Sequence, residues 1–383
     1  MPDAPAVSPT NDSDTGAPRE QGSALCLSGG GYRAMLFHVG SLWRLYEAGR
    51  LKPLKRISSV SGGSITAGVL ALAWDRLSFD PASDDFARLV AAPLRKLAGR
   101  TIDVGSVLGG VFGKESAGER VAAAYKEQLF GDATLQDLPD SARFVINATN
   151  IQSGALWRFS KPYMADYRVG QVPNPTVPLA LAVAASSSFP PILSPLTLDL
   201  NPAAFTPDPR ADLQRPPFTE RAVLSDGGVY DNLGLETVWK NFSEVLISDG
   251  GAKIAAEEAP KHDWPRHAYR VLDVIDNQVR SLRKRAAIAG FQAAKDSPMH
   301  RDGTYWGIGT AYADYAAHDP RLACPAAATQ RLAQVPTRLA AMPGATQEKL
   351  VNWGYAVTDA ALRSWVDRDL RAAKGFPYPA SGV

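Results

Sequence analysis

Two glycine-rich turns near the amino terminus constrain the fold of this chain more than any other feature. They are Ser28-Gly29-Gly30-Gly31-Tyr32-Arg33 and Ser59-Val60-Ser61-Gly62-Gly63-Ser64. Each follows a short β-like run, Ala24–Leu27 or Arg56–Val60, and precedes a helix-like one. The first turn offers backbone amides at a helix start, where developing negative charge is stabilised. The second lifts a serine hydroxyl out of the sheet, as a nucleophile elbow does. The pair indicates ester chemistry.

Further β-like runs alternate with helical ones along the first two thirds of the chain. The predicted strands are Arg143–Thr149, Ala222–Ser225 and Val245–Ser248, and the predicted helices are Tyr32–Ala48 and Ser64–Trp74. The run at Arg143–Thr149 is nearly continuous in apolar residues, which is typical of a central parallel strand. This alternation predicts an α/β fold with a mostly parallel, helix-covered sheet and its chemistry at the carboxyl ends of the strands.

The 383 residues are expected to form one core with additions at both ends. Residues 1–22 are rich in Pro, Ser, Asp and Thr and are predicted to be a disordered tail without signal-peptide features. Residues 23–252 contain both turns and the predicted strands. Residues 253–383 lack the β/α rhythm and are expected to be a mainly helical and irregular extension packed on the core. Within the core, Asn201–Pro217 holds five prolines and is predicted to be a loop insertion.

Composition narrows the function classes. A net charge of only +2 gives no reason to expect nucleic acid as a partner. The two cysteines, Cys26 and Cys324, form no disulfide framework, so a reducing, cytoplasmic location is expected. No apolar stretch reaches the length of a bilayer span, so any membrane contact is expected to be peripheral. No metal-binding motif is present, and composition leaves the oligomeric state open.

A long amphipathic helix is predicted over His262–Phe291. One face carries the apolar residues Leu272, Ile275, Val279 and Leu282. The other face carries the basic residues Arg280, Arg283, Lys284 and Arg285. We expect a core helix with a solvated basic face. The alternative, a membrane-surface helix, requires the apolar residues to be exposed.

With these turns in place, the chain resembles the patatin-like phospholipases, a family of serine lipid acyl hydrolases. The resemblance covers roughly residues 23–252 through four blocks: the glycine loop with its arginine, the serine elbow, Ala184–Pro195 (AASSSFPPILSP) and Asp226–Asn232 (DGGVYDN). It implies a three-layer α/β/α sandwich that cleaves carboxylic ester bonds of phospholipids or related lipids without a cofactor. It also implies an acyl-serine intermediate and an acyl pocket lined by Ala184–Pro195.

The resemblance implies that Ser61 is the nucleophile. The family pattern is Gly-x-Ser-x-Gly, and this chain departs from it at Ser59, which is still a small residue. Ser58, Ser59 and Ser64 are nearby competitors, but only Ser61 has both a preceding strand and the following small pair Gly62-Gly63.

The resemblance further implies that Asp226 activates Ser61 directly, without a histidine. A carboxylate with an ordinary pKa of about 4 is a poor base for a serine hydroxyl, so desolvation has to help. Asp249 is a rival, because it also ends a strand and precedes two glycines. Asp226 is favoured because Tyr230-Asp231-Asn232 follows it as in the family block. Asp231 and Asn232 are themselves expected only to cap a helix over Leu233–Trp239.

The amides of Gly29, Gly30 and Gly31 are expected to form the oxyanion hole, with Arg33 holding the loop. A nucleotide-phosphate loop is disfavoured, because neither Gly-x-Gly-x-x-Gly nor Gly-Lys-Ser/Thr occurs there. His38 is expected to have a structural role. The other histidines, His262, His267, His300 and His318, follow the last block and leave a Ser-His-Asp triad as an alternative.

Two questions remain open at this point. A general carboxylesterase or thioesterase acting on soluble acyl groups is an alternative function, as is a catalytically silent lipid-binding protein. Intact Ser61, Asp226 and glycine loop argue against the silent protein. The apolar, glycine-rich run Ile102–Phe112 is either a lid or membrane-contact loop, with Val107–Phe112 as the contact, or part of the core.

Overall fold

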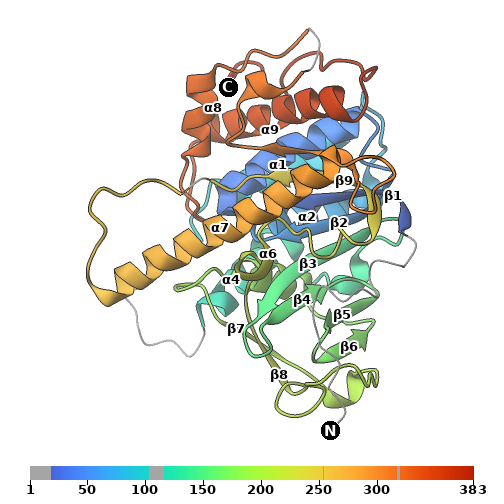
Figure 1. Cartoon of the computed structure of the whole chain (residues 1–383), viewed down its shortest axis with the longest axis vertical. Coiled ribbons are helices and arrows are strands. Elements are labelled where there is room, and N and C mark those ends of the chain that lie inside the picture. Colours follow the sequence, from blue (N-terminus) through green and yellow to red (C-terminus); the bar gives the residue numbers. More distant parts are fainter. Residues whose placement is uncertain (1–18, 103–115, 253, 317–319) are drawn as a thin grey trace.

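A ten-stranded sheet organises the computed structural model, which describes residues 19–102, 116–252, 254–316 and 320–383 (Figure 1). Five neighbouring strands are parallel, in the order β10 (Asp302–Gly307), β9 (Phe242–Asp249), β1 (Glu20–Leu27), β2 (Leu54–Val60) and β3 (Arg143–Asn150). The strands predicted from the sequence are confirmed here, each slightly longer than expected. Their carboxyl ends lie at one edge of the sheet, which is where both glycine-rich turns begin.

Antiparallel strands extend the sheet beyond β3. They are β4 (Ala155–Phe159), β5 (Tyr163–Asp166), β6 (Gly170–Pro173), β7 (Leu196–Asp199) and β8 (Arg221–Asp226). β4 pairs with one side of β3, whereas β8 pairs with its other side, beyond the end of β2. The segment 201–217 between β7 and β8 is a loop with one short 3₁₀ turn, as its prolines predict.

Helices cover both faces of the sheet, which confirms the α/β class. They are α1 (Gly31–Glu47), α2 (Gly62–Ala73), α3 (Ala92–Ala98), α4 (Ala117–Tyr125), α5 (Leu179–Ser186), α6 (Gly228–Asp231), α7 (Trp264–Gln292), α8 (Ala326–Ala333) and α9 (Gly344–Trp365). Alternation along β1 sorts the layers: Leu25 belongs to the large core formed with α1, α2 and α9, and Cys26 to a smaller core. The smaller core is closed by turns at 233–239 and by the last turns of α7.

The carboxyl-terminal residues are more than an attached extension. β10 adds a parallel strand beside β9, and α9 lies along α1 (Figure 1). Asp359 of α9 makes a buried ion pair with Arg44 of α1 at 2.7 Å. The sequence did not predict β10, because the short run Asp-Gly-Thr-Tyr-Trp-Gly carries little strand signal.

α7 confirms the predicted long helix but reverses its expected orientation. Leu272 and Ile275 are 53% and 51% exposed, and Leu282 is exposed to a similar extent. The basic residues Arg280 and Arg283 instead turn toward the body and form ion pairs there. The expectation of an apolar face buried in the core was therefore wrong. The basic face turns inward because the surface under α7 contains the buried carboxylates of Asp231 and Asp249, which require cationic partners.

Two further expectations concern short segments. Residues 233–239 form turns rather than the expected helix, and Asp231 accepts hydrogen bonds from the Leu233 and Glu236 amides at 3.1 and 2.7 Å. Of the run Ile102–Phe112, all but Ile102 lies outside the described residues. Within the described residues, no helix combines the length and apolar character that crossing a membrane requires.

Candidate active site

The register of the sheet brings Ser61 and Asp226 together. β2 ends with Val60 paired to Asn147 of β3, and the next residue of β3, Ala148, pairs with Asp226. β2 and β8 therefore meet end to end along the same side of β3. Ser61, which follows Val60, is placed beside the last residue of β8 although the two lie far apart in the sequence.

Ser61 occupies a strained elbow. Its φ and ψ are 51° and −120°, a conformation that L-residues rarely adopt, and its amide donates to Ser186 Oγ at 3.0 Å. A Cβ at Gly62 would overlap the Gly31 carbonyl oxygen, and one at Gly63 would overlap that of Leu27. Because these two residues have no side chain, the serine turn can approach the backbone of the glycine loop closely. Ser61 is largely buried, with 7% of its surface exposed.

The glycine loop lies against this serine, and its three amides differ. The Gly29 amide donates to both the backbone oxygen and Oδ1 of Asn232, each at 3.1 Å. Among the described residues, the Gly30 and Gly31 amides have no such acceptor. In this structure Asn232 thus occupies the Gly29 donor, and the role expected of Gly29 in an oxyanion hole stays a prediction. Gly30 and Gly31 are the amides available to a ligand oxygen.

Asp226 is a buried carboxyl group with a raised pKa. Burial raises this pKa to about 7, against the opposing effects of the Gly228 amide and the Ser61 hydroxyl, and the charge of Asp276 on α7 adds to the rise. The Gly228 amide donates to Oδ1 at 2.7 Å. Oδ2 is buried and has no hydrogen-bond partner within bonding distance among the described residues, and the Ser61 hydroxyl, which lowers this pKa, is a neighbouring donor. A carboxylate with a pKa near neutrality suits a general base.

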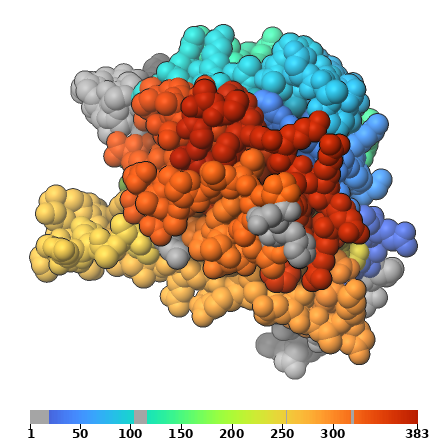
Figure 2. All heavy atoms as spheres, turned by 90° about the horizontal axis from the view of Figure 1, so that it is seen from above, coloured from blue at the N-terminus to red at the C-terminus, as the bar shows by residue number. Residues whose placement is uncertain are grey.

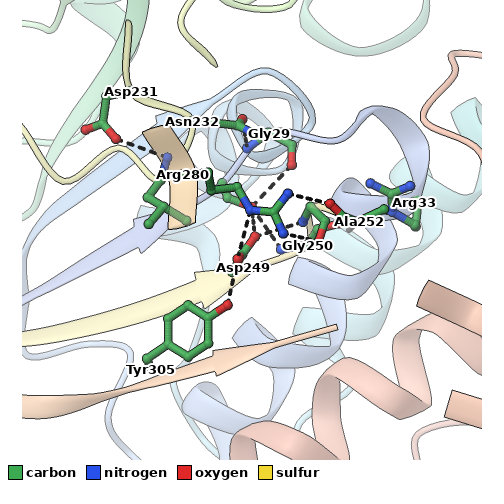
Figure 3. Close-up of polar contacts among 12 residues, drawn as sticks. Gly29, Arg33, Asp231, Asn232, Asp249, Gly250, Ala252, Arg280 and Tyr305 are labelled. Carbon is green, nitrogen blue, oxygen red and sulfur yellow. Dashed lines mark hydrogen bonds and ion pairs between the residues drawn. The ribbon is translucent and has the colours of Figure 1, made fainter. Parts of the chain in front are cut away.

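Asp249, the rival carboxylate, is fully partnered (Figure 3). It accepts hydrogen bonds from the Tyr305 hydroxyl at 2.6 Å and the Gly251 amide at 2.9 Å, and it lies 3.3 Å from Arg280. Burial alone would raise its pKa, but Arg280 and these hydrogen bonds hold the pKa below its ordinary value. Asp249 is therefore a stable anion that fixes neighbouring elements, and it is poorly suited to accept a proton.

Arg33 fastens the glycine loop to two other segments. Its guanidinium donates to the carbonyl oxygens of Gly250 at 3.0 Å and Val335 at 2.6 Å. Burial lowers its pKa to about 10, so it stays charged at neutral pH. The sequence predicted a role in holding the loop, and these bonds are consistent with it.

No described histidine contacts Ser61 or Asp226 through a hydrogen bond. His38 is buried between the Ser28 carbonyl (2.9 Å) and the Ser248 hydroxyl (2.8 Å), and burial lowers its pKa to about 4. It is a neutral group joining β1 and β9. His262 and His267 are exposed, His300 contacts Asp302, and His318 lies outside the described residues.

Three contributors to the site were missed in the sequence. Ser186 accepts from the Ser61 amide and donates to the Asn147 carbonyl oxygen at 2.6 Å. Asn232 holds the Gly29 amide, a role different from the helix cap expected of it. Both lie in blocks already singled out, which was the available signal. The third, Arg280, comes from a helix whose basic face was expected to be solvated. Within the described part of the chain, no cluster of three or more His, Cys, Asp or Glu side chains is arranged for a metal ion.

Comparison with known proteins identifies the family to which the chain belongs. The model of the family described as patatin-like phospholipase matches residues 25–239, which is more than half of the chain. The chain belongs to the patatin-like phospholipase family, a family of lipid acyl hydrolases. Searching curated protein sequences returned no significant match.

The search of solved structures returned distant proteins. Human GIVD cytosolic phospholipase A2 in complex with methyl gamma-linolenyl fluorophosphonate aligns with a TM-score of 0.50 and 13% identity, over 91% of this chain and 59% of that one. VipD from Legionella pneumophila aligns with a TM-score of 0.36 and 17% identity, over 89% and 66% of the two chains. This chain thus spans about three fifths of the length of the phospholipase structure, and the likeness concerns the fold.

Proposed function

We propose that the protein is a serine esterase of lipids that uses Ser61 as nucleophile and Asp226 as base. The observation that carries this proposal is the meeting of a strained elbow serine with a buried carboxyl group of pKa about 7. The amides of Gly30 and Gly31 supply the oxyanion donors beside them. The family and the phospholipase neighbour support a phospholipid or related lipid as substrate.

The proposed reaction has two balanced halves. Ser61 Oγ attacks the ester carbonyl carbon while its proton passes to Asp226, and the Gly30 and Gly31 amides stabilise the resulting oxyanion. Collapse breaks the bond to the alcohol, which leaves with the proton from Asp226. Water then attacks the acyl-serine, Asp226 takes a proton from it, and the fatty acid is released as Ser61 recovers its hydrogen.

Replacement of Ser61 by alanine tests the proposal. Ser61→Ala should abolish both ester hydrolysis and labelling by a fluorophosphonate, with a rate loss of at least ~10³-fold, because the covalent route is removed. Labelling is measured by intact mass, and hydrolysis is measured on phospholipid vesicles and on a soluble short-chain ester. Labelling that persists on another serine would contradict the assignment. Activity confined to soluble esters would instead support a general carboxylesterase.

A further inference from the structure

α7 presents an uncovered apolar stripe, here called the outer face. It consists of Trp264, Val271, Leu272, Ile275 and Leu282. Four of them recur at helical spacing, seven, four and seven residues apart, so they lie along one side of the helix. Trp264 is 81% exposed. Figures 1 and 2 show the first turns of α7 standing clear of the rest of the molecule. Such a patch on a soluble protein marks a docking surface.

The charges on α7 are divided between its two sides. Its exposed residues include Arg266, His267 and Arg285 but neither aspartate nor glutamate. The two acidic residues of the helix, Asp273 and Asp276, are half-buried, and Asp276 lies near Arg280 and Asp249 of the body-facing side. At the start of the helix Arg266 pairs with the exposed cap residue Asp263 at 2.6 Å, so Arg285 and His267 are the basic groups beside the apolar stripe. An apolar surface with a few basic groups along its helix suits a lipid surface, whose phosphates are negative.

Arg338 adds a positive charge between α7 and the glycine loop. Its carbonyl oxygen accepts from the Tyr32 amide at 3.0 Å and would lie 2.7 Å from a Cβ at Gly31. Burial raises the pKa of Tyr269 on α7, and the charge of Arg338 acts against that rise. The Arg338 side chain is exposed and makes no ion pair or hydrogen bond with a described residue. It is thus an uncommitted cation at the edge of the site.

α7 is held firmly beside the catalytic residues. Arg280 donates to the carbonyl oxygens of Gly251 and Ala252 at 2.8 and 2.6 Å, next to its ion pair with Asp249 (Figure 3). Arg283 lies 3.6 Å from Asp231, a few residues after Asp226. Anything that binds the outer face is therefore brought next to the candidate active site.

We propose that the outer face of α7, together with Arg338, docks the protein on a phospholipid bilayer, with Arg338 pairing with a lipid phosphate beside the glycine loop. The inference rests on the proposed function, because a bilayer can contact the outer face and also supply the substrate of Ser61 only if that substrate is a lipid. α7 then lies along the interface with its apolar stripe among the acyl chains. A second copy of the chain on this face is the competing occupant, which the test below separates.

Vesicle co-sedimentation tests the docking surface with matched variants. The double variant Leu272→Gln/Ile275→Gln should bind phosphatidylcholine vesicles containing phosphatidylglycerol at least about tenfold more weakly than wild type. Trp264→Gln should also weaken binding, whereas Trp365→Gln should not. Trp365 is 59% exposed but lies beside Gly22 and Glu244, at the opposite edge of the sheet.

Arg338→Gln tests the phosphate contact. It should weaken binding to the anionic vesicles about fivefold at low salt, and the difference should shrink at high salt, because loss of one cation near a charged surface removes a screened attraction. Equal unfolding midpoints establish that each variant is folded. Wild-type binding by the double variant, or equal effects of Trp264→Gln and Trp365→Gln, would overturn the proposal. So would a wild-type dimer that the double variant dissociates, measured by light scattering.

The docking proposal and the proposed function can fail separately. Ser61→Ala should still bind vesicles, since binding needs no chemistry. A wild-type protein that hydrolyses a soluble ester but binds no vesicles refutes the docking surface alone. One that binds vesicles through α7 but hydrolyses no ester refutes the proposed function alone.

Discussion

The Asp226 carboxyl group combines burial with the neighbouring Ser61 hydroxyl, and both matter for its role. Burial disfavours its ionised form and raises the pKa to about 7. The same burial that makes it a stronger base also costs folding free energy, because the ionised form loses its hydration. Besides burial, the Gly228 amide, the Ser61 hydroxyl and, from α7, Asp276 act on this pKa.

Activity should therefore follow the ionisation of Asp226. Only the carboxylate accepts the serine proton, so kcat/KM on a soluble ester should rise about tenfold per pH unit below pH 7 and level off above it. Stopped assays across pH 5 to 9 in buffers of constant ionic strength measure this profile. A profile that levels off already at pH 5 would show that the base has an ordinary carboxyl pKa.

Paired substitutions at the two aspartates should have opposite effects on stability. Folded Asp226 holds its proton up to about pH 7, whereas the unfolded carboxyl loses it near pH 4, so stability falls as pH rises between these values. The resulting loss in free energy of unfolding is on the order of 4 kcal/mol. Asp226→Asn removes this loss, so it should raise the unfolding midpoint at pH 8, and it should also abolish activity. Asp249→Asn leaves the largely buried Arg280 without its anion and should lower the free energy of unfolding by a few kcal/mol, and hence the midpoint, while activity persists in the folded fraction.

The unfolding midpoints of both aspartate variants are measured by thermal unfolding at pH 5 and pH 8, and their activities are measured by ester hydrolysis. The gain of Asp226→Asn should be small at pH 5, where wild-type Asp226 is protonated. An inactive Asp249→Asn with wild-type stability would transfer the base to Asp249.

Single residues were predictable from the sequence where a motif fixed their surroundings. Ser61 and Asp226 come from local blocks, and the register of β3 places them side by side. The occupied amide of Gly29 could not be foreseen, because its acceptor, Asn232, reaches it only through the tertiary fold.

The two turns work as one unit, because the second passes directly under the first. A Cβ on Gly62 overlaps the Gly31 carbonyl oxygen, so Gly62→Ala must push the glycine loop away from Ser61. Misplacement of about 1 Å costs on the order of 10²-fold in rate, and we expect a loss of that size in kcat on a soluble ester. Gly344→Ala is the matched control, since nothing lies within 4 Å of its added Cβ. Full activity of Gly62→Ala would show that the two turns move independently.

α7 illustrates the limit of pattern reading for an element. Its period correctly predicts a helix and separates an apolar from a basic face. Which face turns inward depends on the partner surface, and here that surface holds the buried anions Asp231 and Asp249. The periodicity of a helix does not depend on which distant residues pack against it, so the sequence could not predict which face of α7 turns inward.

The described residues after 252 share one buried interior with the core. α1 and α9 approach so closely that a Cβ on Gly40 would overlap the Val351 carbonyl oxygen, and one on Gly354 would overlap that of Phe37. This reciprocal contact needs a glycine on each helix. The sequence predicted an extension packed on the core, but it could not show that the core sheet itself continues into β10.

Removing residues 253–383 should therefore prevent folding. Truncation after Ala252 would expose the apolar side of α1 to water and remove Asp359, which lies 2.7 Å from Arg44 in the folded protein. The fragment 1–252 should show neither a cooperative urea transition nor dispersed amide resonances. The full chain should unfold in one transition that coincides by circular dichroism and tryptophan fluorescence, because α9 and the core share one interior. A cooperatively folded fragment 1–252 would contradict this, since it would mean that α1 can be stable with its α9 face in water.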